Sequence, residues 1–362
     1  VTPTGTSAGA GVQAGWEIDL FGGARAGRRA AQARLEGAQA GWHEARVSVA
    51  ADVASNYLAL RACEAQLVQT QTDTASREET ARLTRLTARA GFQAPANESL
   101  ARASAAQGRA LLAAQRAQCD LAVKALVALT AIDEPTLRPQ LAAAGARLPQ
   151  PAQIVVNAVP GEVLNQRPDL YIAARELVAA SADVSQASAQ RLPRITLAGS
   201  LTAGRFESGS FSTNGSLWAI GPLAVSVPLF DGGRRAANVE AARARYDEAL
   251  VTYRAKLRGA VREVEEALVQ LQSADSRRDD ARIAAEGFDA SYKATEARFR
   301  GGLASLFELE DARRSAAQAH SQLIELERES AAAWITLYRA LGGGWTAAGE
   351  THTAAALDAA SK

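Results

Sequence analysis

The repeat that decides the fold is the stretch LFDGG at residues 229–233, which occurs a second time as LFGG at residues 20–23. Two further landmarks follow in the same order: RAG at 89–91 returns as RGG at 300–302, and LVALT at 126–130 returns loosely as YRALG at 338–342. The spacing between the two copies stays close to 210 residues throughout. A nearly constant spacing over three landmarks indicates a tandem duplication.

The duplication divides the chain into two structural repeats. We expect the first at residues 1–147, the second at 148–345, and a disordered tail at 346–362. Before its LFDGG, the second copy carries a proline-rich link, a helical run and two strand-like runs. The counterparts of residues 160–206 would precede Val1, so we expect the first repeat to be N-terminally incomplete.

Long proline-free runs predict that most of the chain is helical. The runs 24–90 and 234–300 are each 67 residues long, which is about 100 Å of helix. Each run meets a glycine turn, at Gly91 in the first copy and at Gly301 and Gly302 in the second. Further helical runs follow at 97–130 and 305–341. The sequence therefore predicts two long helical hairpins.

The second hairpin carries a heptad pattern. One row consists of Leu250, Leu257, Val264 and Leu271, and its companion row of Tyr253, Ala260, Ala267 and Ala274. This seam of large and small residues favours close, coiled-coil-like packing, with an ordinary amphipathic helix as the alternative. A separate helix is expected at 169–190, between Pro168 and Pro193.

Three runs alternate between apolar and polar residues, as β-strands do. They are Ala10 to Leu20, Ile195 to Ala203 and Leu217 to Leu229, with a polar, glycine-rich loop expected at 207–215. Aromatic residues lie near the expected run ends: Phe206, Phe211, Trp218 and Phe230. Such runs are typical of transmembrane β-strands, although a small soluble sheet is the alternative. Because three strands cannot close a barrel, a membrane barrel would need strands from several chains.

Composition and motifs exclude several classes of protein. The chain has 40 Lys and Arg residues against 39 Asp and Glu residues, and this balance argues against a nucleic-acid partner. No 18-residue apolar window predicts a transmembrane helix. Phosphate-binding, nucleophile-elbow and zinc-protease motifs are absent from the sequence. We therefore expect no enzyme activity, no cofactor and no metal site, and we interpret His43 and His320 as helix-face residues.

Five motifs together resemble a known family. They are RPDL at 167–170, LPRI at 192–195, PLFDGGR at 228–234, RFRGG at 298–302 and LYRALGGGW at 337–345. The chain resembles the TolC-like outer-membrane factors over about residues 9–345. It is most similar to their OprM-like (NodT-type) branch, the outer-membrane channels of resistance-nodulation-division efflux pumps.

This resemblance implies a fold that is mainly α with a β-barrel portion. Relatives form homotrimers, with a barrel of twelve strands in the outer-membrane lipid and a periplasmic α-barrel of twelve helices. It also implies a passive exit duct that works with a periplasmic adaptor (membrane fusion) protein and an inner-membrane resistance-nodulation-division transporter. Two alternatives stay open: a type I protein-secretion duct on the same fold, and a soluble coiled-coil scaffold without a pore.

The only two cysteines of the sequence are placed to form a disulfide. Cys63 lies 28 residues before Gly91, and Cys119 lies 28 residues after it. In an antiparallel hairpin that turns at Gly91, the two residues fall at the same height, and an export compartment is oxidising. The alternative is a pair of buried free thiols.

A gate is expected near the turn of the second hairpin, because a duct that stayed open would leak. Phe307, Asp311 and Arg314 share one helix face by their spacing, and Glu308 lies beside them. Relatives place an apolar plug or acidic rings at these turns, and threefold symmetry would make each residue a ring of three. The alternative is that the charged members of this set form a solvated helix face.

Overall fold

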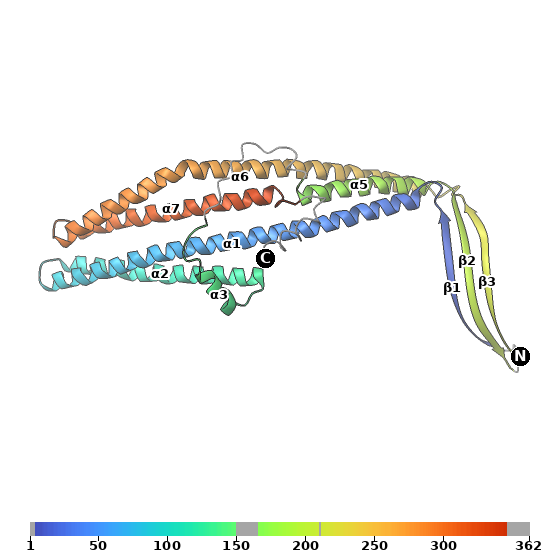
Figure 1. Cartoon of the computed structure of the whole chain (residues 1–362), viewed down its shortest axis with the longest axis horizontal. Helices are drawn as coiled ribbons and strands as arrows, with labels where there is room; N and C mark the ends of the chain where they lie inside the picture. Colours follow the sequence, from blue (N-terminus) through green and yellow to red (C-terminus); the bar gives the residue numbers. More distant parts are fainter. Residues whose placement is uncertain (1–3, 150–165, 210, 346–362) are drawn as a thin grey trace, which may run out of the picture. The chain divides into compact units, whose positions relative to one another are not determined.

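The computed structural model describes residues 4–149, 166–209 and 211–345, and these are mostly helical (Figure 1). One strand precedes the first helical hairpin. A short helix, a second helix and two more strands lead to the second hairpin. The predicted tail at 346–362 lies outside the described residues. None of the described helices is both long enough and apolar enough to cross a membrane.

The first hairpin consists of α1 (Gly23–Arg89) and α2 (Pro95–Thr130). Gly91 adopts a φ of 81° in the turn, a conformation that favours glycine, and Pro95 begins α2. Both helices were expected within two residues of these bounds. The short helix α3 (Glu134–Ala142) was not expected; the Asp133 side chain caps it by accepting a hydrogen bond from the Thr136 N–H at 3.2 Å.

The second hairpin consists of α6 (Arg234–Arg300) and α7 (Leu306–Ala340), as the heptad pattern predicted. Within α6, the predicted seam is buried from Ala260 to Ala274, with Val264, Ala267 and Leu271 packing against Ala333, Leu337 and Ala340 of α7. Small residues in the seam allow the two helix backbones to approach each other.

Helix α5 (Pro168–Ala189) packs on the first part of α1 through alanines: Ala30 and Ala33 meet Ala179 and Ala182. An ion pair between Arg34 and Asp183 joins the same two helices at 2.5 Å. Because the contact consists of small residues, α5 and α1 lie close together.

The strands β1 (Thr6–Ile18), β2 (Arg194–Ser208) and β3 (Phe211–Ser226) form one antiparallel sheet in the order β1-β2-β3. Residues that face each other across an antiparallel pair share one face of the sheet. One face is apolar: Val12 pairs with Leu201 and Leu201 with Trp218, while Trp16 pairs with Leu197 and Leu197 with Leu223. The opposite face carries Gln13, Glu17, Thr196, Ser200 and Thr202.

The apolar face is not covered by other described residues. Val12, Trp16, Leu201, Trp218, Ile220, Leu223 and Val225 are all exposed large hydrophobic residues. The sheet is therefore amphipathic, and its apolar face is open to the surroundings.

Two expectations about β3 were wrong. The predicted loop at 207–215 is mostly strand, because the chain turns tightly after Ser208 and resumes pairing at Phe211. Trp218 therefore lies in the middle of β3 rather than near its end. In addition, a register shift between Leu197 and Gly199 places Leu217 and Ala219 on the polar face. A bulge of this kind exchanges the faces of all residues on one side of it.

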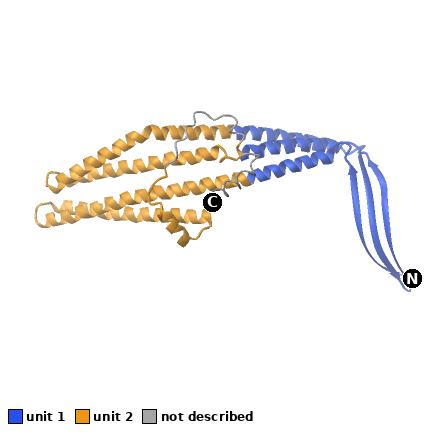
Figure 2. Cartoon of the chain, in the orientation of Figure 1, with its two compact units in different colours: residues 1–41, 168–257 blue, residues 42–167, 258–362 orange. Residues whose placement is uncertain are grey.

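The contacts divide the described chain into two compact units (Figure 2). Unit 1 comprises residues 1–41 and 168–257, and unit 2 comprises residues 42–167 and 258–362. Each unit contains segments from both predicted repeats. The repeats are defined by sequence similarity, whereas the units are defined by which segments pack together. The repeat boundaries at 147 and 345 stay a prediction.

Candidate gate

The first turn of α7 begins with a capping box. The Glu308 N–H donates to Ser305 Oγ at 3.1 Å, and the Ser305 N–H donates to Glu308 Oε2 at 2.6 Å. The hydrogen bond from the Ser305 N–H to the carboxylate, followed by the contribution of the Ser305 side chain, holds the pKa of Glu308 below its ordinary value. Glu308 is therefore ionised at neutral pH, and its carboxylate caps the start of α7.

The other predicted gate residues lie exposed on the same two turns. Phe307 is 74% exposed, a large fraction for an aromatic side chain, and Asp311 and Arg314 are also exposed. An exposed face with one aromatic ring and charges of both signs is available to other chains or to solvent. No hydrogen bond or ion pair joins these side chains to one another within the residues that the structure describes, and their role as a gate stays a prediction.

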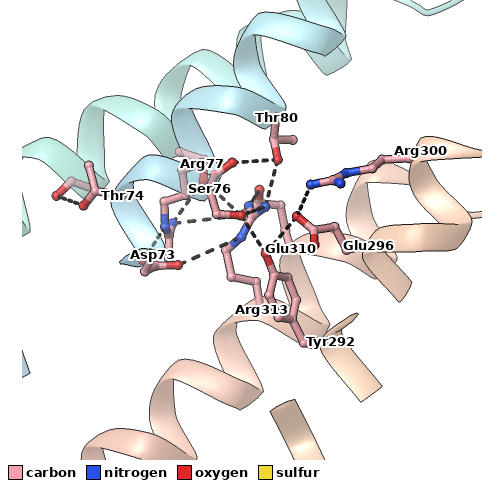
Figure 3. A network of polar contacts seen from close by, with 12 residues as sticks. Asp73, Thr74, Ser76, Arg77, Thr80, Tyr292, Glu296, Arg300, Glu310 and Arg313 are labelled. Atoms are coloured by element: carbon pink, nitrogen blue, oxygen red, sulfur yellow. Dashed lines mark hydrogen bonds and ion pairs between the residues drawn. The ribbon is translucent and has the colours of Figure 1, made fainter. Parts of the chain in front are cut away.

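The neighbouring residue Arg313 is buried instead, at 2% exposure, and it joins the two hairpins (Figure 3). Its guanidinium donates to Thr80 Oγ1 at 2.8 Å and to Ser76 Oγ at 3.2 Å, both on α1. On its own helix it also pairs with Glu310. The Tyr292 hydroxyl of α6 lies 2.6 Å from Ser76 Oγ, so α6 and α7 both bind this point of α1.

The network extends to Asp73 and Arg77 of α1 and to Ser104 of α2. Arg77 pairs with Asp73 at 2.7 Å and donates to Ser104 Oγ at 3.0 Å. Ser104 in turn donates to Glu310 Oε2 at 2.9 Å. Asp73 Oδ1 lies 3.9 Å from Arg313 Nε, and neither of these two atoms has a hydrogen bond within the part of the chain that the structure describes. We call these eight residues the inter-hairpin network: Asp73, Ser76, Arg77, Thr80, Ser104, Tyr292, Glu310 and Arg313.

Burial makes this network sensitive to any single replacement. A buried ion pair contributes little net stability compared with apolar packing, but removal of one partner leaves an uncompensated charge and costs about 3–5 kcal/mol. An arrangement of this kind specifies one register between the hairpins. It also provides a contact that could be released as a unit.

An apolar cluster lies on the same side of the hairpins, toward their turns. Ala81, Ala101 and Ala105 of the first hairpin pack against Leu306 and Leu309 of the second. Leu309 is fully buried, and Tyr292 and Phe299 border the cluster. The hairpins are thus joined near their ends by a polar network and a compact apolar contact together.

The turns of both hairpins expose apolar side chains. Phe92, next to Gly91, is 84% exposed, and Leu303, next to Gly302, is 74% exposed. Gly302 adopts a φ of 74°, which matches the φ of 81° at Gly91. The predicted turn residues therefore form two similar tips, each with one prominent hydrophobic side chain.

The structure joins Cys63 and Cys119 by a disulfide, with their Cα atoms 5.5 Å apart. This separation lies within the range that a disulfide requires. Around it, Leu60, Val123 and Leu126 form the apolar core that packs α1, α2 and α3 together. The bond therefore lies within the first hairpin, and its formation in the purified protein stays a prediction.

The sequence reasoning missed Arg313, although a signal was present. Leu306, Leu309, Arg313 and Ala316 follow each other at spacings of three and four, and all are buried. That is the spacing of a heptad seam, which places residue 313 inside the packed face and residue 314 outside it. An arginine within such a seam needs buried hydrogen-bond partners. The polar residues Ser76 and Thr80 of α1 provide them.

The chain is similar to known outer-membrane proteins. A family model described as "Outer membrane efflux protein" matches residues 2–131 and 159–343. The outer membrane protein OprJ of Pseudomonas aeruginosa is 30% identical, over 91% of this chain and 68% of that protein. The pyoverdine export outer membrane protein OpmQ of Pseudomonas putida is 31% identical, over 96% of this chain and 73% of that protein.

Solved structures show the same fold. The outer-membrane channel OprN superposes with a TM-score of 0.84 at 27% identity, covering 95% of this chain and 82% of that one. The open state of the MtrE outer membrane channel of Neisseria gonorrhoeae superposes with a TM-score of 0.74 at 26% identity, covering 94% of this chain and 81% of that one. All of these similar proteins are outer-membrane proteins, not enzymes.

Proposed function

Because this chain belongs to the family of outer membrane efflux proteins, we propose that it forms the exit duct of a tripartite efflux pump. The duct is passive: an inner-membrane transporter of the resistance-nodulation-division class supplies the energy, and a periplasmic adaptor connects the two. The observation that carries this proposal is the amphipathic sheet, since a soluble scaffold has no use for an open apolar face.

The two faces of the sheet suit a barrel wall in a membrane. The apolar face, with Val12, Trp16, Leu201 and Trp218, would meet lipid, and the face with Gln13, Ser200 and Thr202 would line an aqueous channel. Strands that alternate in this way are typical of outer-membrane barrels. The sheet thereby supports a pore with a polar interior.

The sheet also favours several chains per barrel. In the order β1-β2-β3, strands β1 and β3 each have one side unpaired within the described residues. Lipid does not tolerate open strand edges, so these edges would pair with strands of neighbouring copies. The family resemblance implies a homotrimer with a barrel of twelve strands, four per chain, of which β1, β2 and β3 would be three. The long helices α1, α2, α6 and α7 of three chains would supply the twelve helices of the α-barrel.

The gate lies where the hairpins meet. Three copies of Phe307 would form an apolar ring that closes the pore by excluding water, with rings of Glu308 and Asp311 next to it. Arg314 would pair with an acid of the same or the next chain. The inter-hairpin network supports this proposal, because it holds the two hairpins of each chain together near the same turns. Opening would move the second hairpin away from the first and break the contacts of Arg313.

The adaptor would bind the hairpin tips. Phe92 and Leu303 are exposed and apolar, and each sits on a tight glycine turn. A hydrophobic anchor presented on a rigid turn suits recognition by a partner protein. Replacement of Phe92 and Leu303 by serine should abolish capture of a purified adaptor from the same pump, whereas replacement of Phe288, which is exposed away from the turns, should not.

Native mass spectrometry of the detergent-solubilised protein tests the assembly. The proposal predicts a trimer that depends on detergent. A stable, well-folded monomer that remains in the soluble fraction without detergent would support the scaffold instead, and would remove the basis for a pore.

Planar-bilayer recordings test the gate residues. We expect Phe307→Ala to raise conductance, and replacement of Glu308 and Asp311 by alanine to lower the preference for cations, measured as a smaller reversal potential in a salt gradient. Glu308→Gln serves as a control for the capping role, since glutamine can keep the capping box while losing the charge. If neither quantity changes when all three residues are replaced, these side chains do not line the gate.

A further inference from the structure

Three segments of unit 1 meet at one end of the sheet. The register pairs Ile18 with Ile195 and Ile195 with Val225, so the end of β1, the start of β2 and the end of β3 lie side by side. Each continues into a helix: β1 into α1, β2 back into α5, and β3 into α6 (Figure 1). We call residues 17–29, 190–195 and 227–235 the junction.

The junction concentrates positive charge. It contains seven arginines and three acids, whereas the whole chain has a formal net charge of only +1. The remainder of the protein is therefore slightly acidic. The excess at the junction is a local feature of one end of the sheet and does not follow from the overall composition.

The acids of the junction are largely used by two of its arginines. Asp19 accepts hydrogen bonds from the N–H groups of Ala24 at 3.1 Å and Arg25 at 2.9 Å, and it pairs with the Arg25 side chain at 3.2 Å. Asp231 does the same at the start of α6, with the Gly233 N–H at 3.1 Å and the Arg235 side chain at 3.3 Å. Both helix N-termini are thus capped, and only Glu17 has no such partner among the described residues.

Five arginines of the junction are exposed and have no side-chain hydrogen bond or ion pair to another residue in the ranges the structure describes. We call this set the arginine collar; it consists of Arg28, Arg29, Arg191, Arg194 and Arg234. Like charges at one end of the sheet repel each other, and bound anions would offset this repulsion.

Exposed apolar side chains lie among the same residues. Leu229 and Phe230 are 92% and 94% exposed, and Leu20, Phe21 and Leu192 are also exposed. Each of the three segments therefore presents between one and three exposed hydrophobic side chains within a few residues of an arginine of the collar. Aromatic and apolar residues beside arginines match the chemistry of a membrane interface, where acyl chains and phosphate groups meet.

We propose that the arginine collar binds the phosphate groups of anionic phospholipids in the periplasmic leaflet of the outer membrane. The proposal rests on the proposed function, because it requires the sheet to lie in a bilayer with its helices on the periplasmic side. Arginine suits this role, since its planar guanidinium can donate two parallel hydrogen bonds to one phosphate. The collar would fix the depth of the barrel in the membrane and select negatively charged lipid around it.

Electron spin resonance of reconstituted protein measures this selection. The purified full-length assembly is placed in phosphatidylcholine bilayers that contain a trace of spin-labelled phosphatidylglycerol or spin-labelled phosphatidylcholine. Lipid in contact with protein is motionally restricted, and the ratio of the two restricted fractions gives the preference. We expect the wild type to prefer phosphatidylglycerol by about threefold, and replacement of the five collar arginines by glutamine to reduce the ratio to about one.

A control variant loses the same charge elsewhere. It replaces five exposed arginines of unit 2 that have no ion pair among the described residues: Arg89, Arg102, Arg116, Arg258 and Arg339. This variant should keep the wild-type preference. A second measurement needs no substitution: about 0.5 M NaCl should weaken the preference of the wild type, because salt screens exposed charges. This second measurement also decides the matter if the collar variant does not fold.

Several outcomes would overturn the proposal. These are a wild type without preference, a preference that survives in the collar variant or in high salt, and an equal loss in the control variant. If the collar variant changes the ion selectivity of the channel but not the lipid preference, the arginines line the lumen instead. Flotation with the vesicles distinguishes failure of the proposed channel from failure of the arginine collar. A protein that does not float refutes the channel itself, whereas one that floats without lipid preference refutes only the collar.

Discussion

Arg313 is the residue whose replacement should affect the hairpins most. Arg313→Ala removes one of the two arginines beside Asp73 and Glu310, whose side chains are only 12% and 13% exposed. Arg77 alone is then left to offset two largely buried carboxylates. The cost expected for an uncompensated buried charge is about 3–5 kcal/mol. We expect a clearly lower thermal midpoint for the assembly, compared with the wild type at one fixed scan rate.

The adjacent Arg314 provides the matched control. It lies one residue away on the same helix but is exposed, so Arg314→Ala should change stability by no more than about 0.5 kcal/mol. Equal midpoints for the two variants would show that the buried network does not hold the hairpins together.

Glu308 should make the start of α7 sensitive to pH. Its pKa is lowered in the folded protein, so its stabilising contribution is complete above the unfolded pKa, near the ordinary value of 4.5, and is lost as the pH falls through the lower folded value. Hydrogen exchange of the first-turn amides, corrected for the intrinsic effect of pH, should therefore show less protection in acid. Glu308→Gln should remove this pH dependence, and a dependence that persists in that variant would assign it to another group.

At the scale of single elements, the disulfide within the first hairpin is a direct test. Mass spectrometry of the non-reduced, denatured protein should find no alkylatable thiol, because Cys63 and Cys119 are joined. Replacement of both cysteines by alanine should cost about 2–4 kcal/mol, mainly by giving the unfolded chain more freedom. Two alkylatable thiols in protein isolated from an oxidising compartment would contradict this.

The helices other than α3 could be predicted from the sequence almost to the residue. Runs without proline set their lengths, glycines such as Gly91 set the turns, and the heptad rows of α6 set the buried face. The strands were harder to place. A register shift near Gly199 changes which residues of β3 face the apolar side, and such a bulge depends on pairing between strands that are distant in sequence.

In the candidate gate, too, contacts between residues that are distant in sequence could not be predicted. The exposed residues Phe307, Asp311 and Arg314 were found by their spacing along one helix, whereas Arg313 depends on Ser76 and Thr80, more than 230 residues earlier in the chain. The acids that cap α1 and α6 were also difficult to predict from the sequence. Arg25 and Arg235 occupy equivalent places in the two repeats, but their partners Asp19 and Asp231 do not. Packing recovers an equivalent contact that alignment of the repeats does not reveal.

At the scale of the whole molecule, the chain belongs to a family of outer-membrane proteins, and its sheet has an open apolar face and two unpaired edges within the described residues. Lipid and neighbouring copies would cover these features together. The inter-hairpin network would then act three times in one assembly, so that release of the hairpins in one chain would favour release in the others. Closure at rest and opening by a partner belong to the proposed gate and stay predictions.

Single-channel conductance in a planar bilayer tests the central claim, which is that the chain forms a gated duct. The wild type should give small, discrete steps, because the hairpins are held together by Arg313 and its partners on α1. Arg313→Ala should give larger steps from the same amount of inserted protein, while replacement of Arg339, which is exposed on the same helix far from the turn, should resemble the wild type. If folded protein that has inserted into the bilayer gave no channel events, as wild type or as Arg313→Ala, the account of this chain as an exit duct would be contradicted.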